Sequence, residues 1–101
     1  MQQQQEQKID IHLSEEVAQG VYTNLAIITH SHAEFILDFV SLMPGLPKGV
    51  VRSRIIVTPQ NAKQLLFALQ DNVQKFETKN GKIALQQQQV VPIMGNTGGK
   101  A

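Results

Sequence analysis

The sequence predicts an α+β protein with a four-stranded antiparallel sheet, made of two hairpins, and one C-terminal helix packed on one face. Three observations support this fold class. Short runs of β-branched and aromatic residues with apolar alternation fill the first half of the chain. A proline- and glycine-rich segment, residues 43–49, interrupts these runs. From residue 59 onward, apolar residues recur at spacings of three and four, which is typical of an amphipathic helix.

The chain has 101 residues, which is enough for one domain, and we place that domain at residues 8–83. Glutamine tracts cannot bury apolar surface. We therefore expect a disordered Gln-rich tail over residues 1–7 and a flexible Gln- and Gly-rich tail over residues 84–101. A domain of this size buries only about 60% of its unfolded surface, so self-association would add to its stability.

Four runs are expected to form strands. The first is KIDIHL, residues 8–13, in which every second residue is apolar. Residues 21–29 and 34–42 are rich in β-branched and aromatic residues and lie four residues apart, as expected for one hairpin. Residues 50–58 resume strand character after the turn residues of segment 43–49 and make the second hairpin.

The helix is expected to begin at Pro59 and to stop at Asn80-Gly81. Thr58 can cap its first turn, and proline is tolerated at the first helical position because its missing N–H is not needed there. Glycine after the last turn is a common helix stop. One side of the helix is apolar, and it carries Ala62, Leu65, Leu66, Leu69, Val73 and Phe76.

The turn positions predict a register for the sheet. A first turn near Ser31-His32 places Ile27 opposite Leu37, and a second turn near Leu46 places Asp38 opposite Arg54. One helix covers one face of such a sheet, so the second face needs another cover. The residues expected on this self-association or partner face are Tyr22, Ile28, Ile36, Asp38, Val40, Leu42, Arg52, Arg54 and Ile56.

A second copy of the chain is the expected cover for this apolar face. Two sheets can pack face to face with their strands nearly aligned, and most homo-oligomers are symmetric dimers. We therefore expect a homo-oligomer, with a dimer favoured. Asp38 and Arg54 would form a cross-strand ion pair on this face or at its rim.

The stretch THSHAEF, residues 29–35, places His30, His32 and Glu34 at alternating positions, which is a ligand set that zinc accepts. In the expected register His30 and Glu34 lie across from each other, but His32 lies in the loop. His12, on the first strand, would be about 26 Å from His30 at 3.3 Å per residue. We interpret the stretch as a turn and expect no metal site and no cofactor.

Other catalytic patterns are weak. The stretch GNTGGK has three residues rather than four between Gly95 and Gly99, so it does not match a phosphate-binding loop. The serines lack the strained turn of a G-x-S-x-G nucleophile. Asp38 lies within a strand, and Arg54 opposite it accounts for its presence. We expect no catalytic residues and no enzymatic activity.

Charge and composition restrict the partners. Nine basic and eight acidic residues give a net charge of +1, which produces no strong field toward nucleic acid or anionic lipid. Lys48, Arg52 and Arg54 form the one small basic stripe. The chain has no cysteine and no apolar run of membrane-spanning length. We expect a soluble, cytoplasmic protein without a membrane partner.

Three segments together resemble a family of small bacterial and archaeal proteins catalogued as a domain of unknown function. They are YTNLAIITHSHAEFILDFVSLMPG (residues 22–45), VRSRIIVTPQNAKQLLFALQDNVQKFE (51–77) and NGKI (80–83). The resemblance covers roughly residues 9–83. It implies a β-sheet-plus-helix domain and brings no established activity, cofactor or catalytic residue.

Three functions are consistent with these expectations. The first is a non-enzymatic, homo-oligomeric interaction module. The second is a holdase that binds unfolded polypeptide, because the order of four strands before a helix is similar to export-chaperone subunits of the SecB type. The third is a nucleic-acid accessory protein that uses Lys48, Arg52 and Arg54.

Overall fold

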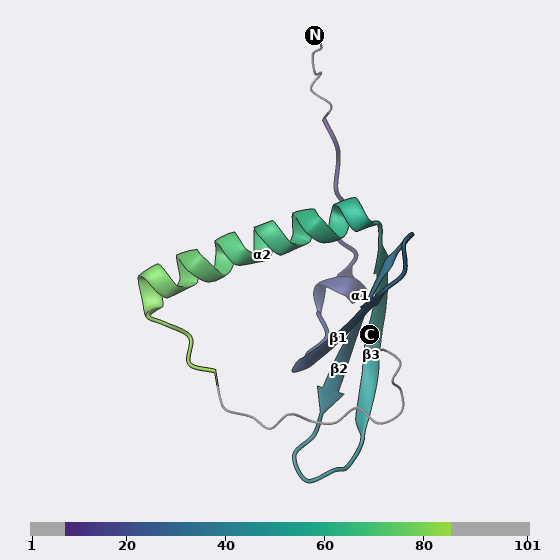
Figure 1. Cartoon of the computed structure of the whole chain (residues 1–101), viewed down its shortest axis with the longest axis vertical. Coiled ribbons are helices and arrows are strands. Elements are labelled where there is room, and N and C mark those ends of the chain that lie inside the picture. The colour runs from purple at the N-terminus through teal and green to yellow at the C-terminus, as the bar shows by residue number, and fades with distance from the viewer. Residues whose placement is uncertain (1–7, 86–101) are drawn as a thin grey trace.

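The computed structural model describes residues 8–85 of the chain (Figure 1). The α+β class, with an antiparallel sheet and a C-terminal helix, is confirmed. The sheet order is β1-β2-β3. The elements, in chain order, are α1 (Glu15–Ala18), β1 (Leu25–His30), β2 (Phe35–Leu42), β3 (Gly49–Val57) and α2 (Pro59–Asn80).

The two predicted tails lie largely beyond this part of the chain. Residues 1–7 fall outside the described residues, and so do residues 86–101 of the C-terminal tail. The two described residues of that tail, 84–85, have no regular secondary structure.

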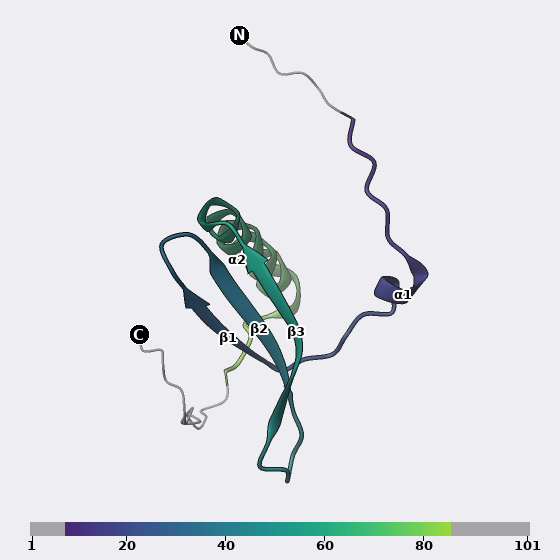
Figure 2. The ribbon, with the colours of Figure 1, turned by 90° about the vertical axis from the view of Figure 1, so that its right-hand side faces the viewer.

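The prediction of four strands is wrong, because residues 8–85 form a sheet of three strands and residues 8–13 pair with none of them. Residues 8–13 run away from the sheet as an extended segment (Figure 2). The reason lies in the next residues. Ser14 caps α1 by accepting a hydrogen bond from the N–H of Val17 at 3.2 Å, and Gly20 follows with a φ of 78°. This helical elbow replaces the hairpin turn that would have returned the chain to β1.

A short turn joins β1 to β2. The Ser31 hydroxyl accepts hydrogen bonds from the N–H groups of Ala33 and Glu34, at 3.1 and 3.2 Å. The N–H of Ser31 donates to the carbonyl of Glu34 at 2.9 Å. The interpretation of this stretch as a turn is confirmed. Because the turn closes between Ser31 and Glu34, His30 lies opposite Phe35 and not opposite Glu34 as predicted.

The turn moves the register of β1 by one residue from the prediction. Ile28, not Ile27, lies opposite Leu37, and Ile27 lies opposite Asp38. Residues directly opposite each other share a face of the sheet, so the side chains of β1 lie on the faces opposite to those predicted.

The register between β2 and β3 is confirmed for five of the eight pairs, from Phe35–Val57 to Phe39–Ser53. Asp38 lies opposite Arg54 as predicted. The pairing then shifts between Phe39 and Val40, and Arg52 is left without a partner on β2. Such a bulge bends the strand that carries the extra residue and increases its local twist.

Gly49 provides space at the hairpin end of the sheet. A Cβ atom on this residue would lie 2.8 Å from Leu42 Cδ2 and 3.0 Å from Val40 Cγ1. The side chains of Leu42 and Val40 therefore lie over the backbone of Gly49, which contributes to the burial of Val40. Any larger residue at position 49 would have to displace them.

The predicted boundaries of α2 are confirmed. Thr58 Oγ1 accepts a hydrogen bond from the N–H of Asn61 at 3.1 Å, and Pro59 occupies the first helical position. At the other end Gly81 has a φ of 98°, and its N–H donates to the carbonyl of Glu77 at 2.9 Å. Local capping chemistry fixes both ends of this helix.

The prediction that the helix packs on one face of the sheet is wrong. α2 projects away from the end of β3 (Figure 1), and none of its residues is buried. The tertiary contacts of the described residues lie mainly between neighbouring strands. Thr58 alone separates β3 from α2, so there is no loop that could bring the helix back across the sheet.

The core of the described residues consists of Leu37 and Val40, which are 6% and 4% exposed. These residues are three apart on the central strand, so they point to opposite faces of the sheet. We call the two sides the Leu37 face and the Val40 face. Neither is covered by α2.

Candidate self-association surface

Six of the nine residues predicted for one face of the sheet lie together. Alternation along β2 and the pairing with β3 place them on the Val40 face. Val40 is buried near the hairpin end, and Ile56 is 54% exposed. The Val40 face carries Ile36, Asp38, Val40, Leu42, Arg54 and Ile56.

The other three predicted residues lie elsewhere. Ile28 lies opposite Leu37 and so belongs to the Leu37 face, which corrects the prediction. Arg52 is the unpaired residue at the bulge, so the register does not assign its side chain to either face. Tyr22 precedes β1 and is exposed.

The sequence prediction missed the residues that β1 contributes to the Val40 face. Leu25 lies opposite Val40, and Ile27 lies opposite Asp38. The signal that identifies them is Ser31. A serine whose hydroxyl accepts the N–H groups two and three residues ahead fixes the turn at residues 31–34, and with it the register.

A bidentate ion pair crosses the Val40 face. Arg54 Nε lies 2.7 Å from Asp38 Oδ1, and Arg54 Nη2 lies 2.9 Å from Asp38 Oδ2. The hydrogen bond from Arg54 lowers the pKa of Asp38, partial burial opposes this effect, and the charge of Arg54 adds to it. The hydrogen bond to Asp38 and its negative charge raise the pKa of Arg54. The Arg54 guanidinium therefore has its counter-ion, Asp38, within the same chain.

Replacing Asp38 with asparagine should reveal this pair through the pH dependence of stability. The folded-state pKa of Asp38 lies below its ordinary value of 3.8. The ionised pair therefore contributes stability that is present above that value and is lost as the pH falls through the lowered folded-state pKa. We expect Asp38→Asn to be less stable than the wild type at neutral pH, with the difference disappearing in acid.

Urea unfolding measured across a pH series tests this expectation. Asp71→Asn is the matched control, because Asp71 pairs with Lys75 along the exposed side of α2, where ion pairs contribute little. A stability difference between wild type and Asp38→Asn that stays constant from neutral to acid pH would contradict the role given to this carboxylate.

One side of α2 presents a continuous apolar surface, which we call the α2 stripe. Alternating steps of four and three residues connect Ala62 to Phe76, which is the spacing of helices that pack against each other along a seam. All of its members except Ala62 are exposed. Large exposed apolar patches mark interaction sites in soluble proteins. The α2 stripe consists of Ala62, Leu65, Leu66, Leu69, Val73 and Phe76.

The chain beyond α2 extends this stripe. The N–H of Ile83 donates to Glu77 Oε2 at 2.9 Å, which folds the segment after Gly81 back toward the helix. Ile83 then lines a shallow, open depression together with Val73 and Phe76. The apolar surface of α2 therefore continues past its C-terminus.

The residues considered for other kinds of site are dispersed. The His30 ring stacks on Phe35, with centroids 5.2 Å apart and planes at 22°. Within residues 8–85 no three potential metal ligands lie together. Arg54 of the predicted basic stripe is paired with Asp38. None of the helices described has the length and apolar character needed to cross a membrane.

Comparison with known proteins identifies a family. Neither the curated proteins nor the solved structures gave a match. The family model described as "Protein of unknown function (DUF3467)" matches residues 1–85, which include the caps of α2, the turn at Ser31 and the Asp38–Arg54 pair. The resemblance found in the sequence is confirmed, and the chain belongs to the DUF3467 family.

Proposed function

We propose that the protein is a cytoplasmic, non-enzymatic interaction module that self-associates, with a dimer as the favoured assembly. One observation carries the proposal: residues 8–85 bury only Leu37 and Val40, while the α2 stripe and much of the sheet are exposed. A chain this size ordinarily forms one continuous core. A second copy supplies the missing cover.

The apolar surface of α2 supplies stabilisation on the same scale as the cost of association. Completing the burial of a half-exposed leucine or phenylalanine contributes roughly 1 kcal/mol, about half of the value for full burial. Five such side chains in each of two copies contribute roughly 10 kcal/mol, which lies within the estimated cost of association of about 4–15 kcal/mol. The Val40 face adds Ile56 and Val51, which are 54% and 52% exposed.

The arrangement of α2 and the sheet leaves room for a second copy. The helix runs away from the sheet at an open angle (Figure 1), so within residues 8–85 the same chain leaves both apolar surfaces uncovered. The seam-like spacing of the α2 stripe favours packing of two α2 helices against each other. The Val40 face is then the second contact of the same assembly.

Light scattering on a sizing column tests the proposal directly. We expect a molar mass of at least twice the 11.2 kDa of one chain, unchanged over a tenfold range of dilution at micromolar concentrations. A mass of 11.2 kDa throughout that range would overturn the proposal.

A second candidate is a holdase that binds unfolded polypeptide. It is favoured by the exposed α2 stripe and by the edges of the sheet at β1 and β3, which no other described strand covers. Suppression of the aggregation of an unfolded client protein, with loss of that effect in Leu69→Asp, would support it. A wild-type chain that assembles but leaves client aggregation unchanged would remove it.

A further inference from the structure

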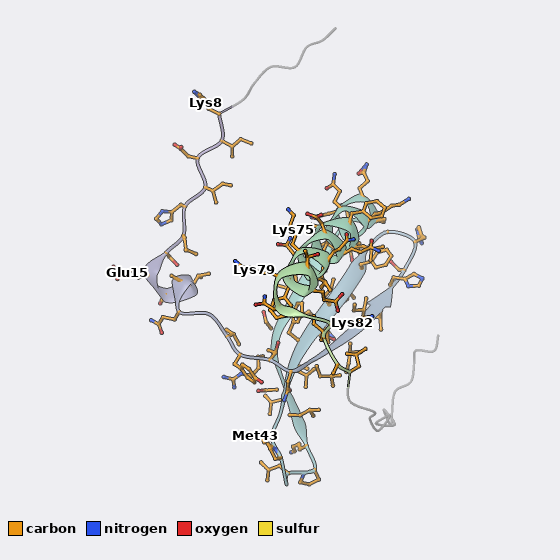
Figure 3. The ribbon with its side chains drawn as sticks, turned by 90° about the vertical axis from the view of Figure 1, so that its left-hand side faces the viewer. Lys8, Glu15, Met43, Lys75, Lys79 and Lys82 are labelled. Atoms are coloured by element: carbon orange, nitrogen blue, oxygen red, sulfur yellow. The ribbon has the colours of Figure 1, made fainter. Side chains whose placement is uncertain are left out.

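The N-terminal arm, residues 8–13, has the pattern of a strand but no strand partner among the described residues. Its apolar residues Ile9, Ile11 and Leu13 are 74%, 87% and 64% exposed. The arm stands clear of the sheet and of α2, with Lys8 at its outer end (Figure 3). Three apolar side chains at alternating positions are costly to leave in water and fit one face of a sheet.

The elbow at α1 keeps the arm away from its own sheet. The Ser14 cap and the positive φ of Gly20 direct the chain outward. Just before β1, the Asn24 side chain makes two hydrogen bonds with the backbone of Leu42. Its Oδ1 accepts from the N–H at 2.8 Å, and its Nδ2 donates to the carbonyl at 3.1 Å. The point at which the chain leaves the sheet is therefore fixed. The arm of a second copy is not attached to this sheet, so these contacts do not direct it away from the β3 edge.

The free edge of β3 can receive the arm. Among residues 8–85, β3 pairs with β2 on one side only, so its other side presents N–H and C=O groups that no described strand pairs with. Gly49–Val57 spans nine residues, or about 30 Å, and the six residues of the arm span about 20 Å in extended form. The arm fits within the length of this edge.

Charge also favours β3 over β1 as the receiving edge. β3 carries Arg52, which makes no ion pair within the described residues. The arm carries Lys8 and Asp10 on the side opposite its apolar residues, and Glu15 and Glu16 follow at the elbow, so residues 8–16 carry three acids and one lysine. β1, LAIITH, offers no lysine or arginine to such acids.

We propose that the arm of one copy adds to the β3 edge of a second copy as the fourth strand of that sheet. The inference rests on the proposed self-association and names its partner surface. It also explains why residues 8–13 carry a strand pattern that their own chain does not use. Main-chain hydrogen bonds provide the affinity in this mode of recognition, and alternate side chains provide the register.

Disulfide trapping tests the inference, because the chain has no cysteine of its own. Ile11→Cys in one chain is mixed with an isotope-labelled chain that carries Val51→Cys or Ile55→Cys, which lie on the two faces of β3. Ile28→Cys on β1 is the matched control. All four positions are exposed, so circular dichroism should show that the variants fold.

We expect a mixed disulfide between Ile11→Cys and at least one β3 position, at least tenfold more abundant than that with Ile28→Cys. Only Cβ atoms about 4 Å apart form an unstrained disulfide. Preferential trapping on β1, or no mixed disulfide in a chain that light scattering shows to be a dimer, would overturn the arm inference and leave the proposed function intact. A monomeric wild-type chain would overturn both.

Discussion

Leu69→Asp in α2 is expected to convert the assembly into single chains of 11.2 kDa while α2 remains helical. Leu69 lies in the middle of the α2 stripe and is 59% exposed, so an aspartate meets water in the single chain and apolar surface in the assembly. Loss of a central apolar contact costs roughly 2 kcal/mol per copy. A symmetric dimer carries the change twice, so the dissociation constant should rise roughly a thousandfold.

Phe67→Asp is the matched control for this prediction. Phe67 is also on α2 and is exposed to a similar degree, but it lies outside the α2 stripe. Light scattering and circular dichroism should show dissociation with Leu69→Asp and retained association with Phe67→Asp. Equal dissociation by both variants, or by neither, would show that the α2 stripe is not the contact.

Much of the local structure could be predicted because the signals are contained in a few neighbouring residues. Thr58 and Pro59 fix the start of α2, and Asn80-Gly81 fixes its end. The pairing of Asp38 with Arg54 followed from the turn expected near Leu46, between their two strands. In each case the residues that determine the local structure are close together in the sequence and can be recognised from their type.

The register of β1 could not be predicted from apolar patterning alone. Leu25, Ala26, Ile27 and Ile28 are all apolar, so a shift of one residue exchanges the faces without a clear loss of burial. The hydrogen bonds of the Ser31 hydroxyl settle the register instead. The register of a strand that is apolar on both faces has to be predicted from the hydrogen bonds of the adjoining turn.

The packing of α2 shows a different limit of sequence patterns. Spacings of three and four residues require an apolar cover for the helix, but they do not say which chain provides it. The single residue between β3 and α2 prevents the helix from folding back on its own sheet. The length of that connection, more than the residue pattern of α2, decides whether the α2 stripe can pack on its own sheet.

Val40→Asp is the substitution expected to damage the fold itself. Val40 is 4% exposed, and its side chain lies over the backbone of Gly49. The cation that the register assigns to the same face, Arg54, is already paired with Asp38, so no residue assigned to this face would pair with a new carboxylate. Burying an unpaired charge costs roughly 3–5 kcal/mol, against a total stability of about 5–15 kcal/mol for a typical domain.

Ile56→Asp on the same face separates damage to the fold from damage to the surface. Ile56 is 54% exposed, so its replacement should leave the free energy of unfolding within about 1 kcal/mol of the wild type at equal chain concentration, beyond any loss through weaker association. Urea unfolding at several concentrations distinguishes the two effects, since association makes stability concentration-dependent. A Val40→Asp chain as stable as Ile56→Asp would mean that Val40 is not part of the core. The core would then lie on the Leu37 face alone, and the Val40 face would be available as contact surface over its whole length.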